Sequence, residues 1–413
     1  MKCNWKEYSV QELIELGMLE EPMDGNHGSI HPKSSDYVKS GVPFIMANNL
    51  SNGIVDYTNC AYISQQQANT LRKGFAHPGD VLLTHKATIG RTAIVDDRYD
   101  TIILTPQVTY YRVKNGISNR YLKYYFDTST FQQTLANWAG SGSTRAYLGI
   151  TAQRKLPIVL PPLEQQVRIA DILTAFDDKI TLNTAINNNL LEQLNQLFIE
   201  FSTRCEWNYL SIGEIAEKVA MGPFGSNIKV STFVESGVPI ISGKHLRGYF
   251  LEEPSYNYIT EAHADKLKNS IVYPKDIVFT HAGNIGQVAM IPDGCEYPYY
   301  VLSQRQFYLR CNTMMVAPEY VLLFFHSKQG QHELLSYANQ TGVPSIAQPA
   351  SNLKKICLPI PPISEQKEWL LVVEPIIAMY QNNYQETKRL SILRDTLLPK
   401  LMSGELDVSN IDL

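Results

Sequence analysis

Two stretches of the chain place apolar residues at alternating steps of four and three, which is typical of helices that pack against another helix. In residues 161–205 these seam positions are Ile169, Leu173, Phe176, Ile180, Asn183, Asn187, Leu190, Leu194 and Leu197. In residues 361–413 they include Tyr380, Asn383, Leu390 and Leu397. The pattern predicts two long helices, each with polar residues near the middle of its apolar stripe.

The polar centres indicate how the two helices pair. A buried Asn in such a seam lowers stability but fixes the register, and two central polar positions meet when the helices run antiparallel. We therefore expect an antiparallel coiled coil. The alternative is that each helix packs only on its neighbouring module. Pro375 should kink or break the second helix, because proline removes a helical hydrogen bond.

The residues before each helical stretch follow a different pattern. Short runs rich in β-branched and aromatic residues, bounded by turn-forming residues, predict strands at 81–84, 102–104 and 277–280, among others. Residues 119–138 and 318–339 predict helices packed on the resulting sheets. We therefore expect two mixed α/β modules, module 1 (residues 1–160) and module 2 (residues 206–360), each followed by a spacer helix at 161–205 or 361–413.

The two modules repeat one another in sequence. LPPLEQQ at 160–166 matches IPPISEQ at 360–366, SGVPFIMANNL at 40–50 matches SGVPIISGKHL at 236–246, and HPGDVLLTHKATIG at 77–90 matches YPKDIVFTHAGNIG at 273–286. Matches that keep their order along a chain indicate a tandem duplication. The predicted fold is α+β, with two pseudo-symmetric mixed α/β domains joined by two long helices that form the coiled coil.

The charge of the chain is unevenly distributed. The formal net charge is −4, of which each helical stretch contributes −3, whereas module 1 carries +3 and module 2 carries −1. Nearly neutral modules permit DNA binding through local basic patches without demonstrating it. The acidic residues of the first helix are expected on its outer face, either solvated or open to a partner: Asp171, Asp177, Asp178, Glu192 and Glu200.

Other features of the sequence indicate where in the cell the protein is expected. No apolar run approaches the roughly 20 residues of a membrane span, and the N-terminus MKCNWKEYSV lacks the apolar core of a signal peptide. The six cysteines are scattered and form no CxxC pair, which favours reduced thiols over disulfides or a metal site. We expect a cytoplasmic protein that binds no membrane and no metal.

Four polar loops fall at equivalent places in the two modules, and loops are where binding residues concentrate. The first loop contains Asn48 and Asn49 in module 1, against Lys244, His245 and Arg247 in module 2. The second contains Lys86, Thr88 and Arg91, against Asn284 and Gln287. The third contains Gln107, against Arg305. The fourth contains Ser143, Thr144 and Arg145, against Gln340, Thr341 and Ser345.

These residue types suit nucleic-acid recognition. Arg and Lys bond guanine, Asn and Gln bond adenine, and Ser and Thr bond phosphate or either base. Any one of them is equally consistent with an ordinary solvated loop. Equivalent loops of the two modules carry different residues. We therefore predict that the two modules read different sequences.

Catalytic motifs are poorly represented. GVPIISGKH (237–245) lacks the spacing of a phosphate-binding loop, and no HExxH or GxSxG occurs. His85 and His281 recur in the repeat, but neither has an obvious carboxylate partner, so a hydrogen-bonding role is favoured over that of a base. The sequence therefore predicts a non-catalytic chain.

The ordered combination of motifs resembles the specificity (S) subunits of type I restriction–modification systems. The resemblance is carried by LPPLEQQVRIADIL with LEQLNQLFIEF, by IPPISEQ with LRDTLLPKLMSGEL, and by the SGVP and THKATIG-like blocks. It covers essentially the whole chain. It implies two target recognition domains that each read half of a split DNA site, with helices 161–205 and 361–402 as the spacer.

The resemblance also implies partners. Two adenine-N6 methyltransferase subunits that use S-adenosylmethionine would dock on the spacer, and motor–nuclease subunits would complete the restriction enzyme, whereas this chain would hold no cofactor. A spacer of about 33 residues is roughly 50 Å long, enough to join half-sites about 34–36 Å apart on double-stranded DNA. The alternatives are a two-module protein-binding scaffold without DNA specificity, or an enzyme with an unrecognised site.

Overall fold

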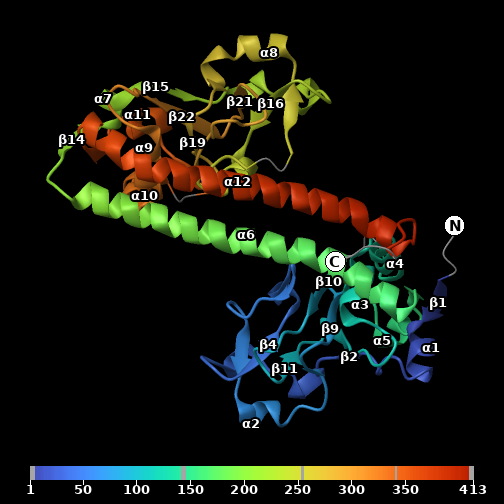
Figure 1. The fold of residues 1–413 in the computed structure, drawn as a ribbon. Helices are drawn as coiled ribbons and strands as arrows, with labels where there is room; N and C mark the ends of the chain where they lie inside the picture. The colour runs from blue at the N-terminus through green and yellow to red at the C-terminus, as the bar shows by residue number, and fades with distance from the viewer. Residues whose placement is uncertain (1–4, 141–145, 253–254, 340–341, 409–413) are drawn as a thin grey trace. The chain divides into compact units, whose positions relative to one another are not determined.

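The computed structural model describes residues 5–140, 146–252, 255–339 and 342–408 (Figure 1). The chain forms two compact units. Unit 1 comprises Met1–Leu182 and Glu386–Leu413, and unit 2 comprises Asn183–Gln385. Each unit therefore contains one module and one segment of each long helix.

Module 1 contains two main sheets. The first has the strand order β2-β12-β9-β10-β6-β5 and the second the order β3-β7-β4-β11-β8. The strands of the first are Met23–Asp24, Val108–Tyr111, Val81–Lys86, Thr88–Ile94, Gly53–Val55 and Leu50–Ser51. Those of the second are Tyr37–Val38, Ala61–Ile63, Val42–Ile45, Ile102–Leu104 and Phe75–Ala76. In the second sheet β4 and β11 are parallel, so their carboxyl ends lie at the same edge.

Module 2 repeats this frame with fewer strands. Its sheets have the orders β15-β22-β19-β20 and β17-β16-β21-β18. The first comprises Ala216–Met221, Gln306–Cys311, Ile277–Thr280 and Val288–Met290. The second comprises Asn257–Ile259, Val238–Ile241, Tyr300–Leu302 and Ile271–Val272. The pair β16 and β21 is parallel, as is its counterpart in module 1.

Two short helices cover each module where one was expected. Module 1 has α3 (Asn119–Asp127) and α4 (Ser129–Trp138), and module 2 has α9 (Pro318–His326) and α10 (Lys328–Leu335). Thr128 and Ser327 separate the pairs, because each adopts an extended backbone and its hydroxyl accepts a hydrogen bond from the next helix. The single helices expected at 119–138 and 318–339 are therefore corrected to helix pairs, and the second range ends in strand β23 (Ala338–Asn339) instead of helix.

The two long helices are α6 (Leu163–Thr203) and α12 (Ile363–Met402), and they pack together antiparallel within each unit. In unit 1 the Lys179 ammonium lies 3.3 Å from Glu386, and Arg394 Nη1 lies 2.7 Å from Asp177 Oδ1. In unit 2 the indole of Trp369 donates to the Leu197 carbonyl at 3.4 Å. The packing of the helices on each other is confirmed over the alternative of two independent helices.

The seam positions face inward along both helices. Ile169, Leu173, Asn183, Leu190 and Leu194 are buried. Phe176, Ile180, Asn187, Leu197, Tyr380, Asn383, Leu390 and Leu397 are partly buried. The polar centre contains a direct pair, since the Asn383 amide donates to Asn187 Oδ1 at 3.0 Å. The break expected at Pro375 was wrong, because α12 continues through it.

The repeated PPxxxQ block fixes the start of each long helix against its module. The buried Gln166 accepts from the Ser118 amide at 3.0 Å and donates to the carbonyls of Gly116 and Pro161. Gln366 makes the same three contacts, to Ala317, Met315 and Pro361. Each glutamine thus joins a helix to a module through main-chain atoms alone.

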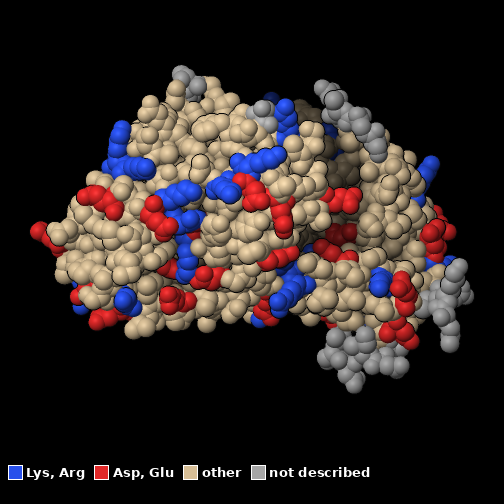
Figure 2. Space-filling model, turned by 90° about the horizontal axis from the view of Figure 1, so that it is seen from above, with Lys and Arg blue, Asp and Glu red and all other residues tan. Residues whose placement is uncertain are grey.

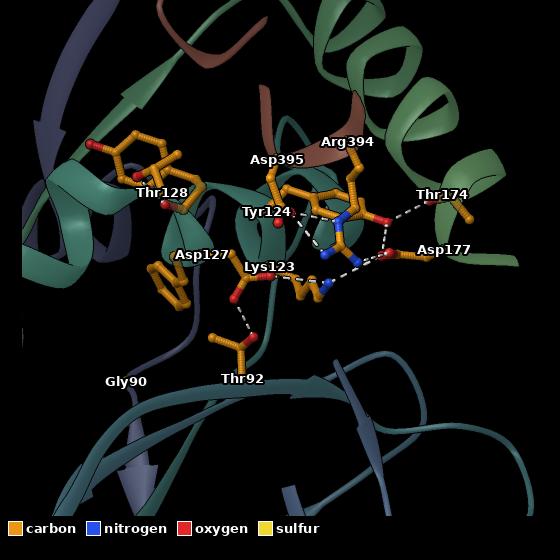
Figure 3. Close-up of polar contacts among 12 residues, drawn as sticks. Gly90, Thr92, Lys123, Tyr124, Asp127, Thr128, Thr174, Asp177, Arg394 and Asp395 are labelled. Atoms are coloured by element: carbon orange, nitrogen blue, oxygen red, sulfur yellow. Dashed lines mark hydrogen bonds and ion pairs between the residues drawn. The ribbon is translucent and has the colours of Figure 1, made fainter. Parts of the chain in front are cut away.

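The remaining contact between module and spacer differs between the units. In unit 1, Asp177 of α6 accepts from the Tyr124 hydroxyl at 2.7 Å, pairs with Arg394 of α12 and lies 3.5 Å from the Lys123 ammonium (Figure 3). In unit 2 the repeat places buried Leu322, Leu323 and Ile377 at the positions of Lys123, Tyr124 and Asp177. The joint is ionic in unit 1 and apolar in unit 2.

The ionic joint also corrects the expected outer face of α6. Asp177 faces inward, and Asp171 pairs with Arg120 of α3 at 2.8 Å. The heptad pattern identifies the side of a helix that meets the other helix, and it does not identify the side that meets a module.

Candidate DNA interface

The predicted loops of module 1 are joined by main-chain hydrogen bonds. The His85 amide, near the end of β9, donates to the Gln107 carbonyl of the third loop at 3.0 Å. The Ala87 amide of the second loop donates to the Ala146 carbonyl, just after the fourth loop, at 3.0 Å. Arg91 reaches the first loop through Nη1, which lies 3.3 Å from the Ala47 carbonyl. The first three loops therefore meet at one edge of the module, with Ala146 beside them.

Module 2 joins its loops in the same way. The His281 amide donates to the Arg305 carbonyl at 2.9 Å, and the Gly283 amide donates to the Pro344 carbonyl at 2.9 Å. The side chain of Gln287 donates to the Gly243 carbonyl of the first loop at 3.1 Å. Ser345 lies beside Ala282 in an antiparallel bridge. The convergence is thus a property of the repeated frame.

In module 2 the first three loops line a polar hollow of about 300 Å³. It is lined by Lys244, Asn284, Gln287 and Arg305 from the predicted set, together with hydroxyl and amide groups of Ser242, Thr280, Ser303 and Gln306. Lys244, Asn284 and Arg305 are exposed. Arg247, also exposed, does not line the hollow.

Module 1 has a hollow of about 340 Å³ at the equivalent place, beyond the carboxyl ends of β4 and β11. Lys86 and Gln107 of the predicted set line it, with His27, His31 and Thr105 beside them. The sequence reasoning missed these last three residues. The available signal was the segment MDGNHGS (23–29), which stands where module 2 has MGPFGSN (221–227).

That segment approaches the strand ends closely in both modules. A Cβ at Gly25 would lie 1.9 Å from the Leu104 carbonyl oxygen, and a Cβ at Gly222 would lie 2.0 Å from the Ser303 oxygen. Only glycine permits so close an approach of two backbones. The segment after β2 or β15 is therefore a fifth part of each loop cluster.

Several predicted contact residues use their side chains inside the module. Buried Asn49 accepts from the Met46 amide at 2.9 Å, and His245 is buried, with its Nδ1 2.9 Å from the Ser242 amide and its Nε2 2.9 Å from the Ser255 carbonyl oxygen. Arg91 and Gln287 bind loop carbonyls as described above. Asn48 and Thr88 are exposed. Ser143, Thr144, Arg145, Gln340 and Thr341 lie outside the described residues.

An ion pair lies behind the module 1 hollow. The buried carboxylate of Asp24 accepts from Lys73 and lies 2.7 Å from His27 Nε2. Burial acts to raise the pKa of Asp24, but Lys73 and His27 outweigh it and hold the pKa below its ordinary value. His85 is buried in β9, with Nδ1 3.0 Å from the Leu148 carbonyl, and burial lowers its pKa. A neutral, strand-bound His85 suits the hydrogen-bonding role expected of it.

The face drawn in Figure 2 gives little electrostatic guidance. Figure 2 shows a face on which Lys and Arg lie among Asp and Glu, and most of the visible surface is uncharged. Within the described residues, no group of three or more His, Cys, Asp or Glu side chains is placed to hold a metal ion. Over the same residues no helix is long and apolar enough to cross a membrane.

Comparison with known proteins identifies the family. The model of the type I restriction modification DNA specificity domain matches residues 3–192 and again residues 205–390. The chain belongs to this family. It is a specificity subunit of a type I restriction–modification system, and by family it is non-catalytic.

Individual specificity subunits resemble it along nearly their full length. The type I restriction enzyme MjaIX specificity subunit of Methanocaldococcus jannaschii is 26% identical over 98% of this chain and 95% of its own. The putative specificity subunit S.HindORF215P of Haemophilus influenzae is 23% identical over 88% of this chain and 89% of its own. The S subunit of M. genitalium shares the fold at 13% identity, with a TM-score of 0.59 and 96% of both chains covered.

Proposed function

We propose that this specificity subunit reads a bipartite DNA target, with one half read by module 1, the other by module 2, and a gap set by α6 and α12. The observation that supports this most is the loop convergence. In each module the second and third loops line a hollow, yet the lining residues differ. Two sites of one design and different chemistry suit two half-sites of different sequence.

The side chains available at each hollow match base and phosphate chemistry. Module 2 offers Arg305 and Lys244, which suit guanine or phosphate, and Asn284, which suits adenine. Module 1 offers Lys86 and Gln107. The exposed Thr88 and Asn48 and the partly buried Ser345 are suited to neighbouring phosphates or bases. Lys244, Arg247 and Lys86 supply the local positive charge that the net charge of the chain lacks.

The partners follow from the same proposal. Two methyltransferase subunits would dock on the spacer helices, and they would bind S-adenosylmethionine, whereas this chain would hold no cofactor. Motor–nuclease subunits would join the complex for restriction. The domain limits that we propose are 1–160 and 206–360 for the recognition modules, with 161–205 and 361–413 as spacer helices and tail.

The test is to express the chain with its methyltransferase partner and to map methylated adenines by sequencing. We expect a split motif with a fixed non-specific gap. Replacing residues 1–160 by another module should change one half only, and a matched replacement of 206–360 should change the other. A continuous motif, or a change of both halves by either exchange, would contradict the proposal.

Two further measurements test the spacer helices and the DNA contacts separately. Inserting one heptad into both α6 and α12, at positions facing each other within one unit, should change the gap and leave both halves intact. Duplex affinity should fall steeply as salt rises, because phosphate contacts release counterions. Salt-independent binding would favour the protein-binding scaffold instead.

A further inference from the structure

The same position of the repeated frame carries a hydroxyl residue in both hollows. Ser303 follows β21 in module 2, and Thr105 follows β11 in module 1. Each lines its hollow. What differs is whether the hydroxyl has a partner within the protein.

In module 2 the hydroxyl belongs to a closed network. Ser303 donates to Gln306, whose amide lies 3.5 Å from Thr280 Oγ1. Thr280 donates to Gln287 at 3.1 Å, and Gln287 donates to the Gly243 carbonyl. The hydrogen-bonding capacity of these side chains is therefore largely used within module 2.

Module 1 lacks that network because Val108 stands where module 2 has Gln306. Thr105 is only 5% exposed, and its Oγ1 has no hydrogen-bond partner among the described residues. Nδ1 of His31, in the same hollow, is also shielded and without a partner there. Buried polar atoms are normally paired, so two unpaired atoms in the wall of one hollow call for an explanation.

The two unpaired atoms limit what the hollow would recognise. Burial lowers the pKa of His31, so its ring is neutral at pH 7. A neutral imidazole has one donor nitrogen and one acceptor nitrogen, so His31 Nδ1 can take either role. The Thr105 hydroxyl is free to donate.

The major-groove edge of a purine presents N7 as an acceptor next to a second polar group, the N6 amino donor of adenine or the O6 acceptor of guanine. We infer that the hollow of module 1 recognises a purine edge, with Thr105 donating to N7 and His31 Nδ1 bonding the neighbouring group. This inference rests on the proposed function and adds its specificity-determining residues. Tyr37, Met46 and Pro106 form the less polar walls that would shield these hydrogen bonds from water.

The test uses Thr105→Val, which keeps the shape and removes the hydroxyl. In the free chain this change should leave the melting temperature unchanged or raise it, because an unpaired buried hydroxyl is removed. In the complex with methyltransferase it should weaken methylation of targets with the normal module 1 half by roughly 10- to 100-fold. Thr105→Ser should retain most of the activity. A structural hydroxyl would show the opposite, with lower stability and unchanged specificity.

Matched controls separate this inference from the proposed function. Ser303→Ala in module 2 should lower stability, because it opens a closed network. Duplexes with a 7-deazapurine at each purine of the module 1 half should identify one position at which wild type loses affinity and Thr105→Val loses little more. If wild type methylates a split motif but no such position exists, the purine site is wrong. If wild type methylates no split motif, the proposed function itself fails.

Discussion

Asp177→Asn tests whether the ionic joint of unit 1 stabilises the module on its spacer. The carboxylate of Asp177 holds Arg394 Nη1 and the Tyr124 hydroxyl at 2.7 Å each, with Lys123 at 3.5 Å. Asparagine keeps the size and one acceptor oxygen but removes the charge. Two cationic groups would then face one another without the carboxylate between them.

The size of the effect follows from burial. Breaking a fully buried ion pair costs about 3–5 kcal/mol, and an exposed pair contributes about 0–1 kcal/mol. The Asp177 side chain is 24% exposed and that of Arg394 is 30% exposed, so the joint lies between these limits. We expect a loss of about 2 kcal/mol in the unfolding free energy of unit 1. For a unit of about 210 residues this lowers its melting temperature by roughly 4–8 °C.

Asp395→Asn is the matched control, because Asp395 pairs with the same guanidinium at 2.8 Å but is 65% exposed. It should cost less than about 1 kcal/mol. The assay is calorimetry of the full chain, in which the transition of unit 1 should move and that of unit 2 should stay. Equal losses for the two variants, or a loss from Asp177→Asn that appears in unit 2, would refute the reasoning.

The other predictions concern the two glutamines, the polar seam and a buried histidine. Gln166→Ala should lower the unfolding free energy of unit 1, and Gln366→Ala that of unit 2, by about 1–3 kcal/mol each, because each change leaves a main-chain amide unpaired. Calorimetry that shows the loss in the other unit would contradict the main-chain contacts. Replacing Asn187 and Asn383 together by Leu should raise stability against urea but weaken the register of the two helices. The register is measured as the spread in the gap between methylated half-sites. A gap as uniform as that of the wild type would show that the pair does not set the register. Burial lowers the pKa of His326 to about 4, so the stability of unit 2 should be complete above pH 6.5 and fall by up to about 3 kcal/mol as the pH drops towards 4. His326→Gln should flatten that dependence, and an unchanged pH profile would count against it.

The long helices and their pairing could be predicted because a heptad pattern is local. Asn183 and Asn187 are the polar seam positions that the spacing indicates, and both lie inward. The inward position of Asp177 could not be predicted, because Tyr124 and Lys123 lie more than 50 residues earlier in the chain. The break at Pro375 was wrongly expected, because α12 continues through it with Val373 and Ile377 buried on either side.

In the loops, too, local features could be predicted and long-range contacts could not. Comparing the two copies was enough to place four loops at equivalent positions, yet the bonds that join them, such as Ala87 to Ala146, connect distant segments. His27, His31 and Thr105 were missed because they lie outside the four loops that were compared, and the strands that bring them together are 50 or more residues apart. The burial of Asn49 and His245 could not be predicted either. The sequence of a loop does not show whether an amide or imidazole side chain points into the module or towards solvent.

The glutamine joint has an evolutionary consequence. Gln166 and Gln366 contact only main-chain atoms of the module, so the side chains at 116–118 and 315–317 can change without disturbing the attachment. An exchange of modules at the Pro-Pro boundary would therefore keep the glutamine contacts whatever side chains the new module carries. The Asp177 joint of unit 1 would not be kept in the same way, because it needs the side chains of Lys123 and Tyr124.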